Sequence, residues 1–481
     1  MLLKNITNLV VIILVGLAVV TTGCDNDDND KDNEVNPKHH VNDWILSNMQ
    51  YFYYWNAEMN VAADKNQTPD QYFSELLVDQ DRFSWLQDNY EELINSLNGV
   101  TLEAGLEFVL YLEDEVTVIA QVTYVKPNSP ASVQFSRGDV ITHINFTPIK
   151  ISNYYNLLAE LNKPFSVLFH RYDALSGSFG AQTHASLVPV QYTENPNYMH
   201  TIIDKGNRKI GYFVYNFFGN GPTAESNQYN NEMDQIFAEF KSEAITDMVV
   251  DLRFNSGGSE QAANNLASLL KKGSPDAIFA KRKFNDALND EIIKDPQRGS
   301  DYLVSKFSTK SANIGDQLTN SRVYILTTRN TASASELVIN SLKPYMDVII
   351  IGDTTYGKNV GSFSLYDEND PANTWGMQPI VLQMFNSRDE SEYENGFVPD
   401  VTILDNDLLL RPLGDPEERL LSVAIEEITG IQSGGRIRAH EKIRKTIAHS
   451  ISLKKRGFNL IVDQNDAIIE GLTKSKAAYD R

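Results

Sequence analysis

Short apolar runs alternate with helical patterns between Lys209 and Thr402, and this alternation restricts the fold of the chain more than any other feature. Buried strands separated by amphipathic helices predict an α/β domain, in which neighbouring strands run parallel. We expect strands at 210–214, 248–252, 323–327 and 348–352, and helices at 227–240, 261–270, 333–342 and 417–428.

The segments before this domain follow other patterns. Residues 41–98 carry aromatic and apolar side chains mostly three to four positions apart, which predicts helices whose aromatic stripe is packing surface. Residues 99–190 contain short alternating runs broken by turn residues, which predict strands, among them 108–112, 116–122 and 139–145. At about 150 residues per domain, the chain is long enough for roughly three domains. The predicted parts are a leader (1–24), an acidic tether (25–40), a helical N-terminal domain (41–98), a β-rich domain (99–190), an α/β core (200–430) and a basic C-terminal extension (431–481).

Charge and cysteine content exclude several classes of function. Acidic residues outnumber basic ones 64 to 42, a formal charge of −22, which argues against a nucleic-acid partner because phosphate binding needs a basic surface. Cys24 is the one cysteine, so the chain has no internal disulfide, thiolate zinc cluster or iron–sulfur site. We therefore expect chemistry without a metal or an organic cofactor.

The last part of the chain reverses the charge balance. From Arg436 to Arg481 there are eleven Lys and Arg against five Asp and Glu. We interpret this segment as a solvated helical extension; contact with an anionic surface is the alternative.

The first residues have the composition of a targeting segment. Lys4 precedes an apolar run, 9–20, which is too short for a comfortable transmembrane helix and typical of a secretory signal peptide. Cys24 follows a small glycine and resembles the lipidated cysteine of bacterial lipoproteins, although Thr21 stands where leucine is usual. The resemblance implies a lipid anchor in the cell envelope; an ordinary signal peptide with an incidental cysteine is the alternative.

The acidic segment 25–34 follows this cysteine directly. It resembles the surface-export signal of Bacteroidetes-type lipoproteins, which implies the outer membrane and leaves exposure at the cell surface open. A solvated tether that holds the protein off the membrane is an equal alternative.

A serine in the α/β core has the surroundings of a nucleophile. The strand at 324–327 runs into a loop of small residues, 330–334, and then into a helix. A serine at this helix N-terminus lies where unpaired N–H groups and the helix dipole favour developing negative charge. Ala332 and Ala334 leave room for a substrate backbone.

A serine hydroxyl needs a base beside it, and no histidine lies between Thr201 and Ala439. Lys358 is the alternative base, provided that burial lowers its pKa from about 10.4 toward neutrality. It follows the apolar strand at 348–351. A parallel neighbour of the strand before the serine would bring this turn to the same edge of the sheet.

The motif Ser333-Ala-Ser-Glu, with Lys358 in a Gly-Lys turn 25 positions later, resembles the C-terminal processing (tail-specific) serine peptidases. The resemblance implies an α/β core of the ClpP/crotonase kind, with Ser333 as nucleophile and Lys358 as base. Ser335 is a competing hydroxyl, which we expect to turn away or cap the helix.

Two further motifs support this resemblance. The segment DLRFNSGG, 251–258, resembles the family's glycine loop, which implies an oxyanion hole made by the N–H of Gly257 or Gly258 and that of Ala334. The segment GFVPDV, 396–401, resembles the family's closing strand.

The chain also departs from the family pattern. Many members carry a glutamine four residues after the lysine, and here Ser362 occupies that position as a candidate third catalytic residue. An insertion at about 276–319 is rich in polar residues. We interpret it as a solvated excursion; a lid or substrate wall is the alternative.

The segment 129–145, which runs from Ser-Pro-Ala through Gly-Asp into a strand, resembles a PDZ domain of the bacterial protease type. Upstream, Gly105, Leu106, Glu107 and Phe108 stand where such a domain places its carboxylate-binding loop. The resemblance implies that this domain binds the C-terminus of a peptide by adding it to a sheet edge.

Together these patterns predict an exported, lipid-anchored serine endopeptidase that acts on proteins or peptides and contacts the membrane through Cys24. Two alternatives remain. One is a catalytically inactive, peptide-binding lipoprotein of the same fold, suggested by Ser362. The other is a surface glycan-binding lipoprotein, suggested by the export signal and the aromatic N-terminal region.

Overall fold

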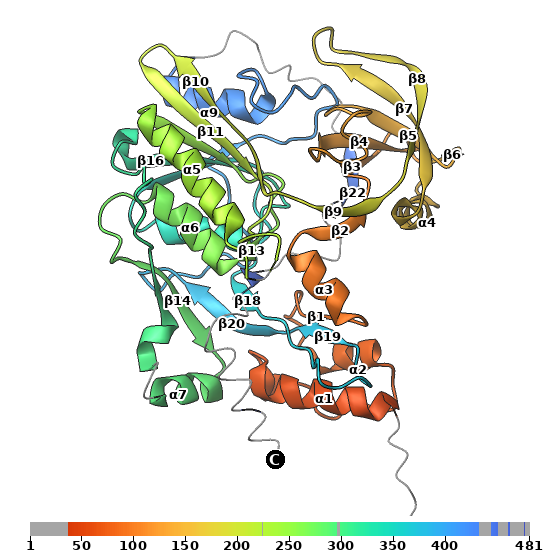
Figure 1. Cartoon of the computed structure of the whole chain (residues 1–481), viewed down its shortest axis with the longest axis vertical. Coiled ribbons are helices and arrows are strands. Elements are labelled where there is room, and N and C mark those ends of the chain that lie inside the picture. The colour runs from red at the N-terminus through yellow and green to blue at the C-terminus, as the bar shows by residue number, and fades with distance from the viewer. Residues whose placement is uncertain are drawn as a thin grey trace, which may run out of the picture. The chain divides into compact units, whose positions relative to one another are not determined.

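The central sheet of the computed structural model has six strands in the order β10-β11-β12-β16-β17-β21 (Figure 1). All neighbours are parallel except β10 and β11. The strands are β10 (Asn197–Lys205), β11 (Arg208–Tyr215), β12 (Asp247–Asp251), β16 (Arg322–Thr327), β17 (Asp347–Gly352) and β21 (Val401–Thr402). The four strands predicted for the core are confirmed, because long apolar runs bounded by turns are buried on both faces.

The structure describes residues 37–223, 225–295, 299–431, 444–450, 460, 461 and 476. Within this part, the residues from Pro37 onward belong to one compact unit. The predicted leader, Cys24 and most of the acidic tether lie outside the described residues.

Helices cover both faces of the central sheet. Val250 and Ile325 pack with α5 (Gln228–Ser242), α6 (Glu260–Leu270) and α8 (Ala334–Leu342). The alternate residues Val249 and Leu326 pack with α9 (Arg419–Thr429). Successive side chains of a strand point to opposite faces, so each strand contributes to two cores. The four helices predicted for the core are confirmed.

A second sheet has the order β13-β23-β18-β20-β14-β15. Its strands are β13 (Gly258–Ser259), β14 (Ile278–Phe284), β15 (Val304–Lys306), β18 (Val360–Ser362), β20 (Ile380–Phe385) and β23 (Leu460–Ile461).

The expected solvated excursion at 276–319 is wrong. This segment supplies β14, β15 and α7 (Asp286–Lys294), and β14 pairs with β20 inside the second sheet. Phe279, Phe284 and Leu288 are buried in the main core. The polar composition misled the prediction, because three consecutive charged residues, 281–283, lie within β14 between the buried residues Ala280 and Phe284. The short 3-10 helices η3 (Gly299–Leu303) and η4 (Thr319–Ser321) complete this segment.

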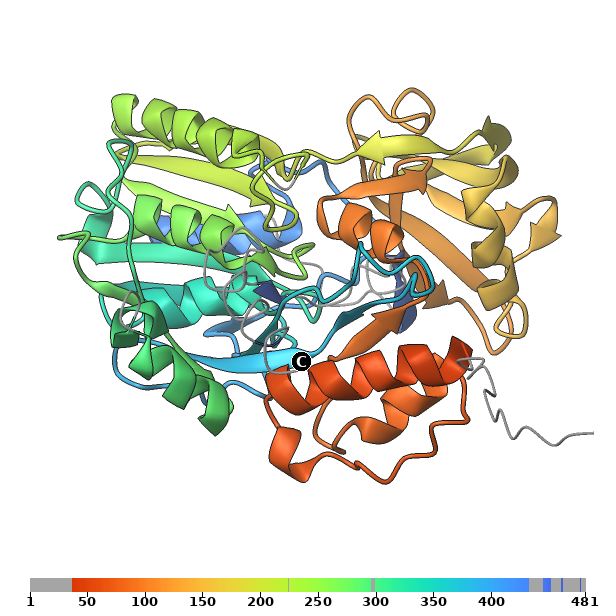
Figure 2. The ribbon, with the colours of Figure 1, turned by 60° about the horizontal axis from the view of Figure 1, so that its bottom comes forward.

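The N-terminal region consists of helices that pack on the core. It contains α1 (Pro37–Phe52), η1 (Asn56–Glu58), α2 (Pro69–Leu76), β1 (Trp85–Gln87) and α3 (Tyr90–Leu97), and β1 pairs with β19 (Gly376–Gln378). Phe52 and Tyr53 are fully buried, and the Phe52 ring lies edge-on to Phe363 at 5.2 Å. The aromatic stripe is therefore packing surface, as predicted. Figure 2 shows α1 and α2 side by side at the bottom of the view.

The β-rich region carries a seven-stranded sheet with the order β22-β3-β4-β5-β7-β8, in which β6 pairs with β5. Its strands are β3 (Leu106–Leu112), β4 (Val118–Val125), β5 (Val140–Ile144), β6 (Thr147–Pro148), β7 (Phe165–Asp173), β8 (Ser178–Leu187) and β22 (Lys445–His449). A separate pair, β2 (Val100–Glu103) with β9 (Val190–Thr193), leads into and out of it, and α4 (Tyr154–Leu158) and η2 (Ala159–Asn162) lie between β6 and β7.

The basic C-terminal extension is not a solvated helix where the structure describes it. Lys445–His449 form β22, which pairs with β3, and Leu460–Ile461 form β23 in the second sheet. A strand of five residues gives a weak periodic signal, so only its pairing partners reveal it. No helix among the described residues has both the length and the apolar character to span a bilayer.

We predict that Phe52→Ala destabilises the protein by about 3–5 kcal/mol, because a large buried ring is lost from the joint between the N-terminal region and the core. The shift of the urea unfolding midpoint measures this effect. Tyr155→Ala is the matched control, since Tyr155 is 71% exposed. Equal midpoints for the two variants would contradict the role assigned to Phe52.

Candidate active site

Ser333 lies at the N-terminus of α8, directly after the loop that leaves β16. Its backbone has φ 60° and ψ −111°, a region that side-chain-bearing residues rarely adopt. The side chain is fully buried, and its hydroxyl has no hydrogen-bond partner among the described residues. Such strain costs about 1–3 kcal/mol and persists only where the surroundings enforce it.

The loop before Ser333 is tied to the end of β12. The hydroxyls of Thr328 and Thr331 donate to the carbonyls of Arg253 and Leu252 at 2.6 and 2.8 Å. The hydroxyl of Ser335 donates to the carbonyl of Asn255 at 3.1 Å. Ser335 thus turns away from the helix N-terminus, as expected.

Glu336 holds the serine loop and the lysine turn together. Its Oε2 accepts the N–H of Ser333 at 2.7 Å and the N–H of Lys358 at 2.8 Å. Its Oε1 accepts the N–H of Gly357 at 2.7 Å and the hydroxyl of Thr355 at 2.5 Å. The amide nitrogens of Ser333 and Lys358 therefore both lie within hydrogen-bond distance of one oxygen atom. Burial raises the pKa of Glu336, and these four hydrogen bonds oppose the increase.

Lys358 is buried in the turn between β17 and β18. Desolvation lowers its pKa to about 7, while the charges of Asp81 and Glu336 partly oppose this change. Parallel pairing of β16 with β17 places Thr327 opposite Gly352, so the serine loop and the lysine turn leave the same edge of the sheet. This is the arrangement that the sequence predicts.

The N-terminal region supplies one wall of the lysine pocket. The Phe83 ring centroid lies 5.1 Å from the Lys358 ammonium nitrogen, and Asp81 accepts the N–H of Phe83 at 2.9 Å. Arg82 donates to the carbonyl of Gly357 at 3.0 Å. Sequence analysis missed these residues, because a contact between segments about 275 positions apart leaves no local pattern. Glu336 could have been found from its Ser-x-x-Glu spacing, which is that of a capping box.

The glycine loop follows β12. Asn255 fixes it, because its Oδ1 accepts the N–H of Gly257 at 2.9 Å while its backbone carbonyl accepts the N–H of Ala332 at 3.2 Å. Gly258 has φ 137°, and a Cβ there would lie 2.0 Å from the carbonyl oxygen of Phe218, so no other residue fits. Ala334 is the first residue of α8, where an N–H has no acceptor within the helix.

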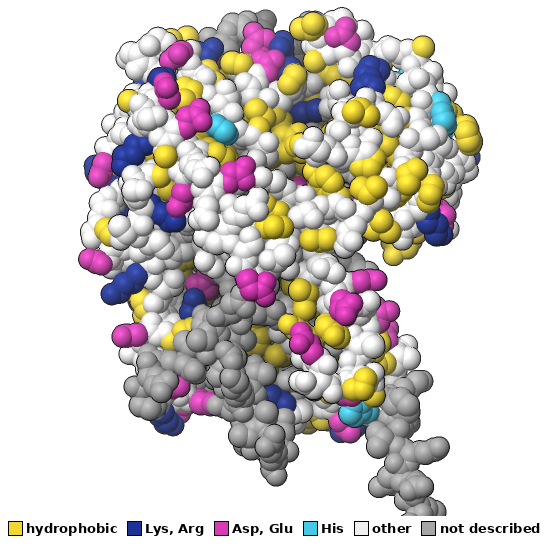
Figure 3. Space-filling model, in the orientation of Figure 1, with side chains coloured by type: hydrophobic (Ala, Val, Ile, Leu, Met, Phe, Trp, Pro, Cys, Tyr) yellow, Lys and Arg dark blue, Asp and Glu magenta, His cyan; other side chains and the backbone are white. Residues whose placement is uncertain are grey.

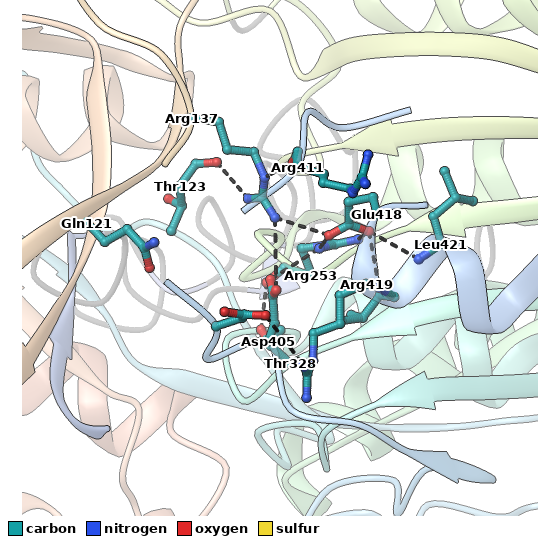
Figure 4. Close-up of polar contacts among 12 residues, drawn as sticks. Gln121, Thr123, Arg137, Arg253, Thr328, Asp405, Arg411, Glu418, Arg419 and Leu421 are labelled. Carbon is teal, nitrogen blue, oxygen red and sulfur yellow. Dashed lines mark hydrogen bonds and ion pairs between the residues drawn. The ribbon is translucent and has the colours of Figure 1, made fainter. Parts of the chain in front are cut away.

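A buried cluster of charged residues lies at the start of the glycine loop (Figure 4). Arg253 contacts Asp251 at 2.9 Å, Glu418 at 2.6 Å and Asp405 at 3.1 Å, and Arg137 of the β-rich region contacts Glu418 at 3.1 Å. Burial by itself would raise the pKa of Glu418, but the two guanidinium groups lower it to about 2. The cluster joins the core, the glycine loop and the β-rich region.

Ser362 is buried on β18, and its hydroxyl donates to the side chain of Gln378 on β19 at 2.8 Å. Gln378, which is fully buried, donates in turn to Ser364. Sequence analysis missed Gln378, because β19 lies next to β18 only in the folded chain.

The candidate peptide-binding residues form a separate site at the start of β3. Gly105, Leu106 and Phe108 line an apolar cavity of about 220 Å³ between β3 and α4, with Leu158 and Val167 on other walls. Glu107 is buried and contacts Lys126 at 3.2 Å. Apolar atoms gather on the right-hand side of Figure 3, over this region. Its exposed large apolar residues include Leu102, Val133, Phe146, Tyr155, Val188 and Val190.

In the part of the chain that the structure describes, no three His, Cys, Asp or Glu side chains gather closely enough to hold a metal ion.

A strained serine at a helix N-terminus and a buried lysine in the turn after the neighbouring parallel strand, with their backbone N–H groups bonded to one carboxylate oxygen, form a site of the serine-hydrolase class. The sequence model of Peptidase family S41 matches residues 209–403, and that of the Peptidase S41 N-terminal domain matches residues 40–85. The chain belongs to peptidase family S41.

Individual proteins agree with this assignment. The chain is 27% identical over 244 residues to the chloroplastic C-terminal processing peptidase of Tetradesmus obliquus. The matched region covers 49% of this chain and 47% of that protein. It is 25% identical over 242 residues to the carboxyl-terminal-processing protease of Picosynechococcus sp., with 50% of each covered. The chain thus spans about half the length of the curated relatives it matches.

Among solved structures, a protein of Bacteroides fragilis described as an S41 protease superposes with a TM-score of 0.66. The two chains are 26% identical, and the match covers 81% of this chain and 98% of that one. The agreement extends well beyond the α/β core, because the core alone makes up a smaller share of the chain.

We predict that Glu418→Gln destabilises the protein by about 3–5 kcal/mol at neutral pH, since it removes the carboxylate that both buried guanidinium groups contact. The pKa of Glu418 is lowered in the folded state, so its contribution is complete above about pH 4.5 and is lost as the pH falls toward about 2. The free energy of unfolding of the variant should therefore change less than that of the parent as the pH falls through this range.

Glu417→Gln is the matched control, because the Glu417 side chain is 69% exposed. Its free energy of unfolding should stay within about 0.5 kcal/mol of that of the parent. If the two variants behaved alike at every pH, the buried cluster would not be the source of the acid sensitivity.

Proposed function

We propose that this chain is a serine endopeptidase that cleaves peptide bonds with Ser333 as nucleophile and Lys358 as general base. The observation that carries the proposal is that the backbone N–H groups of Ser333 and Lys358 both donate to Oε2 of Glu336. In addition, burial lowers the pKa of the Lys358 side chain to about 7. Membership of a serine peptidase family supports it.

Lys358 suits the role of base because it is uncharged for part of the time at neutral pH. In its neutral form it takes the proton from the Ser333 hydroxyl as the oxygen attacks the scissile carbonyl. The resulting ammonium then gives a proton to the leaving amine as the peptide bond breaks. Water hydrolyses the acyl-enzyme by the same transfers in reverse order.

The negative oxygen of the tetrahedral intermediate needs N–H donors. Ala334 supplies one, because it is the first residue of α8. We assign the second to Gly258 rather than Gly257, because the N–H of Gly257 already donates to Asn255. Ser362 keeps its predicted role as the third catalytic residue, linked through its hydroxyl to Gln378.

The β-rich region, on this proposal, is a PDZ-like domain that binds substrate peptides, in the way PDZ domains receive a peptide C-terminus beside a sheet edge. Its support is the position of Gly105, Leu106 and Phe108 in the lining of the apolar cavity. Val100–Thr193 precede the core strands, so the domain is inserted between the N-terminal helices and the α/β core.

We also propose that the protein is exported and anchored in the cell envelope by a lipid on Cys24, at the outer membrane, with the acidic segment 25–34 as a surface-export signal. The support is the sequence alone: the short apolar run, the glycine before the cysteine and the acidic residues after it. The glycan-binding alternative loses its main support, because aromatic side chains such as Phe52 and Tyr53 are buried in the core.

We predict that Ser333→Ala reduces cleavage of an unstructured protein by about 10³-fold or more, whereas Ser335→Ala keeps most of the activity. Both serines are fully buried and two residues apart, so the pair separates the nucleophile from a structural serine. Gel assays of casein cleavage measure both rates. Equal rates for the parent and Ser333→Ala would favour the inactive, peptide-binding alternative.

We predict that activity rises with pH with a midpoint near 7, because only neutral Lys358 accepts the serine proton. Phe83→Ala admits water to the lysine pocket and reduces desolvation, so the midpoint should move up by about one pH unit or more. The pH dependence of kcat/KM, measured from about pH 5 to about pH 10, gives the midpoint for the parent and for the variant.

Phe146→Ala is the control for this profile, since Phe146 is 67% exposed and belongs to the β-rich region. Its midpoint should equal that of the parent. An unchanged midpoint in Phe83→Ala would show that this ring does not keep Lys358 dry.

A further inference from the structure

The edge of β3 that a peptide would use is already occupied by the chain's own C-terminal segment. β22 adds to β3 as an antiparallel strand, with Lys445 opposite Leu112 and His449 opposite Val109 (Figure 1). It forms the outermost strand of the seven-stranded sheet. The segment therefore runs toward Gly105–Phe108, the direction in which a PDZ ligand approaches its carboxylate-binding loop.

Ser450, the residue after β22, is buried at the end of this loop. Its hydroxyl oxygen accepts the N–H of Phe108 at 2.8 Å and donates its hydrogen to Oε2 of Glu107 at 2.5 Å. Ser450 also lines the apolar cavity beside Leu106 and Phe108. The backbone donor that a bound peptide would need is thus engaged by Ser450.

The charges around this position favour a hydroxyl over a carboxylate. Glu107 is one of three carboxylates that surround the fully buried ammonium of Lys126, with Glu103 at 2.6 Å and Glu194 at 2.5 Å. Among the described residues, this cluster contains one cation and three anions, so its described part is formally negative. A peptide's terminal carboxylate would add a fourth negative charge, whereas a serine hydroxyl donates a hydrogen bond to Glu107.

The same C-terminal segment pairs again near the catalytic residues. Leu460 and Ile461 form β23, which runs parallel to β13 with Leu460 opposite Gly258. Ile461 also lies opposite Ser362 on β18. The strand therefore lies between the glycine loop and the strand that follows Lys358, where both edges could otherwise pair with an extended substrate.

We propose that residues 444–450 are a tethered ligand of the PDZ-like domain. The domain selects a serine hydroxyl through Glu107 and Phe108. Another peptide can pair with the edge of β3 only when residues 444–450 are displaced. The inference goes beyond the proposed peptidase function. It does not require catalysis, so binding can be measured in the Ser333→Ala background, where a failure of the peptidase proposal has no effect on the result.

The test uses the full chain carrying Ser333→Ala and a fluorescent, amidated peptide with the sequence of residues 443–453. Adding Ser450→Glu places a fourth carboxylate beside Glu107 and should expel the tethered segment. Because a tethered ligand competes at an effective concentration of about a millimolar, peptide affinity should rise by about tenfold or more. Ser450→Thr, which keeps the hydroxyl, is the matched control and should bind like the parent.

Hydrogen–deuterium exchange keeps the test decisive if Ser450→Glu has effects elsewhere. Exchange should accelerate at the amides of β3 and stay unchanged in the central strands β12 and β16. Equal peptide affinity in all three proteins, or unchanged exchange in β3, would overturn the tethered-ligand proposal.

A second comparison tests the selectivity for a hydroxyl. A peptide of residues 443–450 that ends in a free carboxylate at Ser450 should bind Ser450→Glu about fivefold more weakly than the same peptide with a terminal amide. Tighter binding of the free acid would show that the groove recognises a C-terminal carboxylate, and would overturn the role given to Glu107.

Discussion

The buried carboxylate of Glu336 is the interaction on which the rest of the site depends. It accepts four hydrogen bonds, two at each oxygen, from the serine loop and from the lysine turn. Hydrogen bonds to a charged group contribute about 1.5–3 kcal/mol each, so the four bonds together exceed the strain of about 1–3 kcal/mol at Ser333. The strained backbone and the buried lysine can therefore persist in the same fold. Glu336 also belongs to α8, so one helix and its N-cap residue carry Ser333, Ala334 and the group that orients both loops.

A second buried charge system fixes the other half of the site. Arg253 would be costly to bury without partners, and its contacts with Asp251, Asp405 and Glu418 provide the necessary compensation. Because Arg253 lies two residues before Asn255, these ion pairs also set the path of the loop toward Gly257 and Gly258. The contact between Arg137 and Glu418 then ties the β-rich region to the same point. The two systems meet at the serine loop, where Thr328 donates to the carbonyl of Arg253.

Much of the core was predictable, because its signals are local. The four core strands are long apolar runs, and their parallel pairing follows from the helices between them. The polar segment 276–319 was predicted wrongly, because a strand with three consecutive charged residues resembles a solvated loop until its partner β20 is known. β22 was missed for the same reason, since five residues of mixed character become a strand only against β3. Gln378 reaches Ser362 from a strand 16 positions away in sequence, which no spacing rule anticipates.

The sequence by itself determined which groups are available for chemistry: a serine with small neighbours before a helix, a lysine after the next apolar strand, a glycine loop, and no histidine within the core. Those features follow from local chain geometry and residue chemistry, so they can be recognised without coordinates. Only the tertiary structure decided how dry Lys358 is, because its desolvation comes from residues such as Phe83 in the N-terminal region. It also decided where residues 444–450 lie, because strand pairing depends on which sheet edge the folded chain offers.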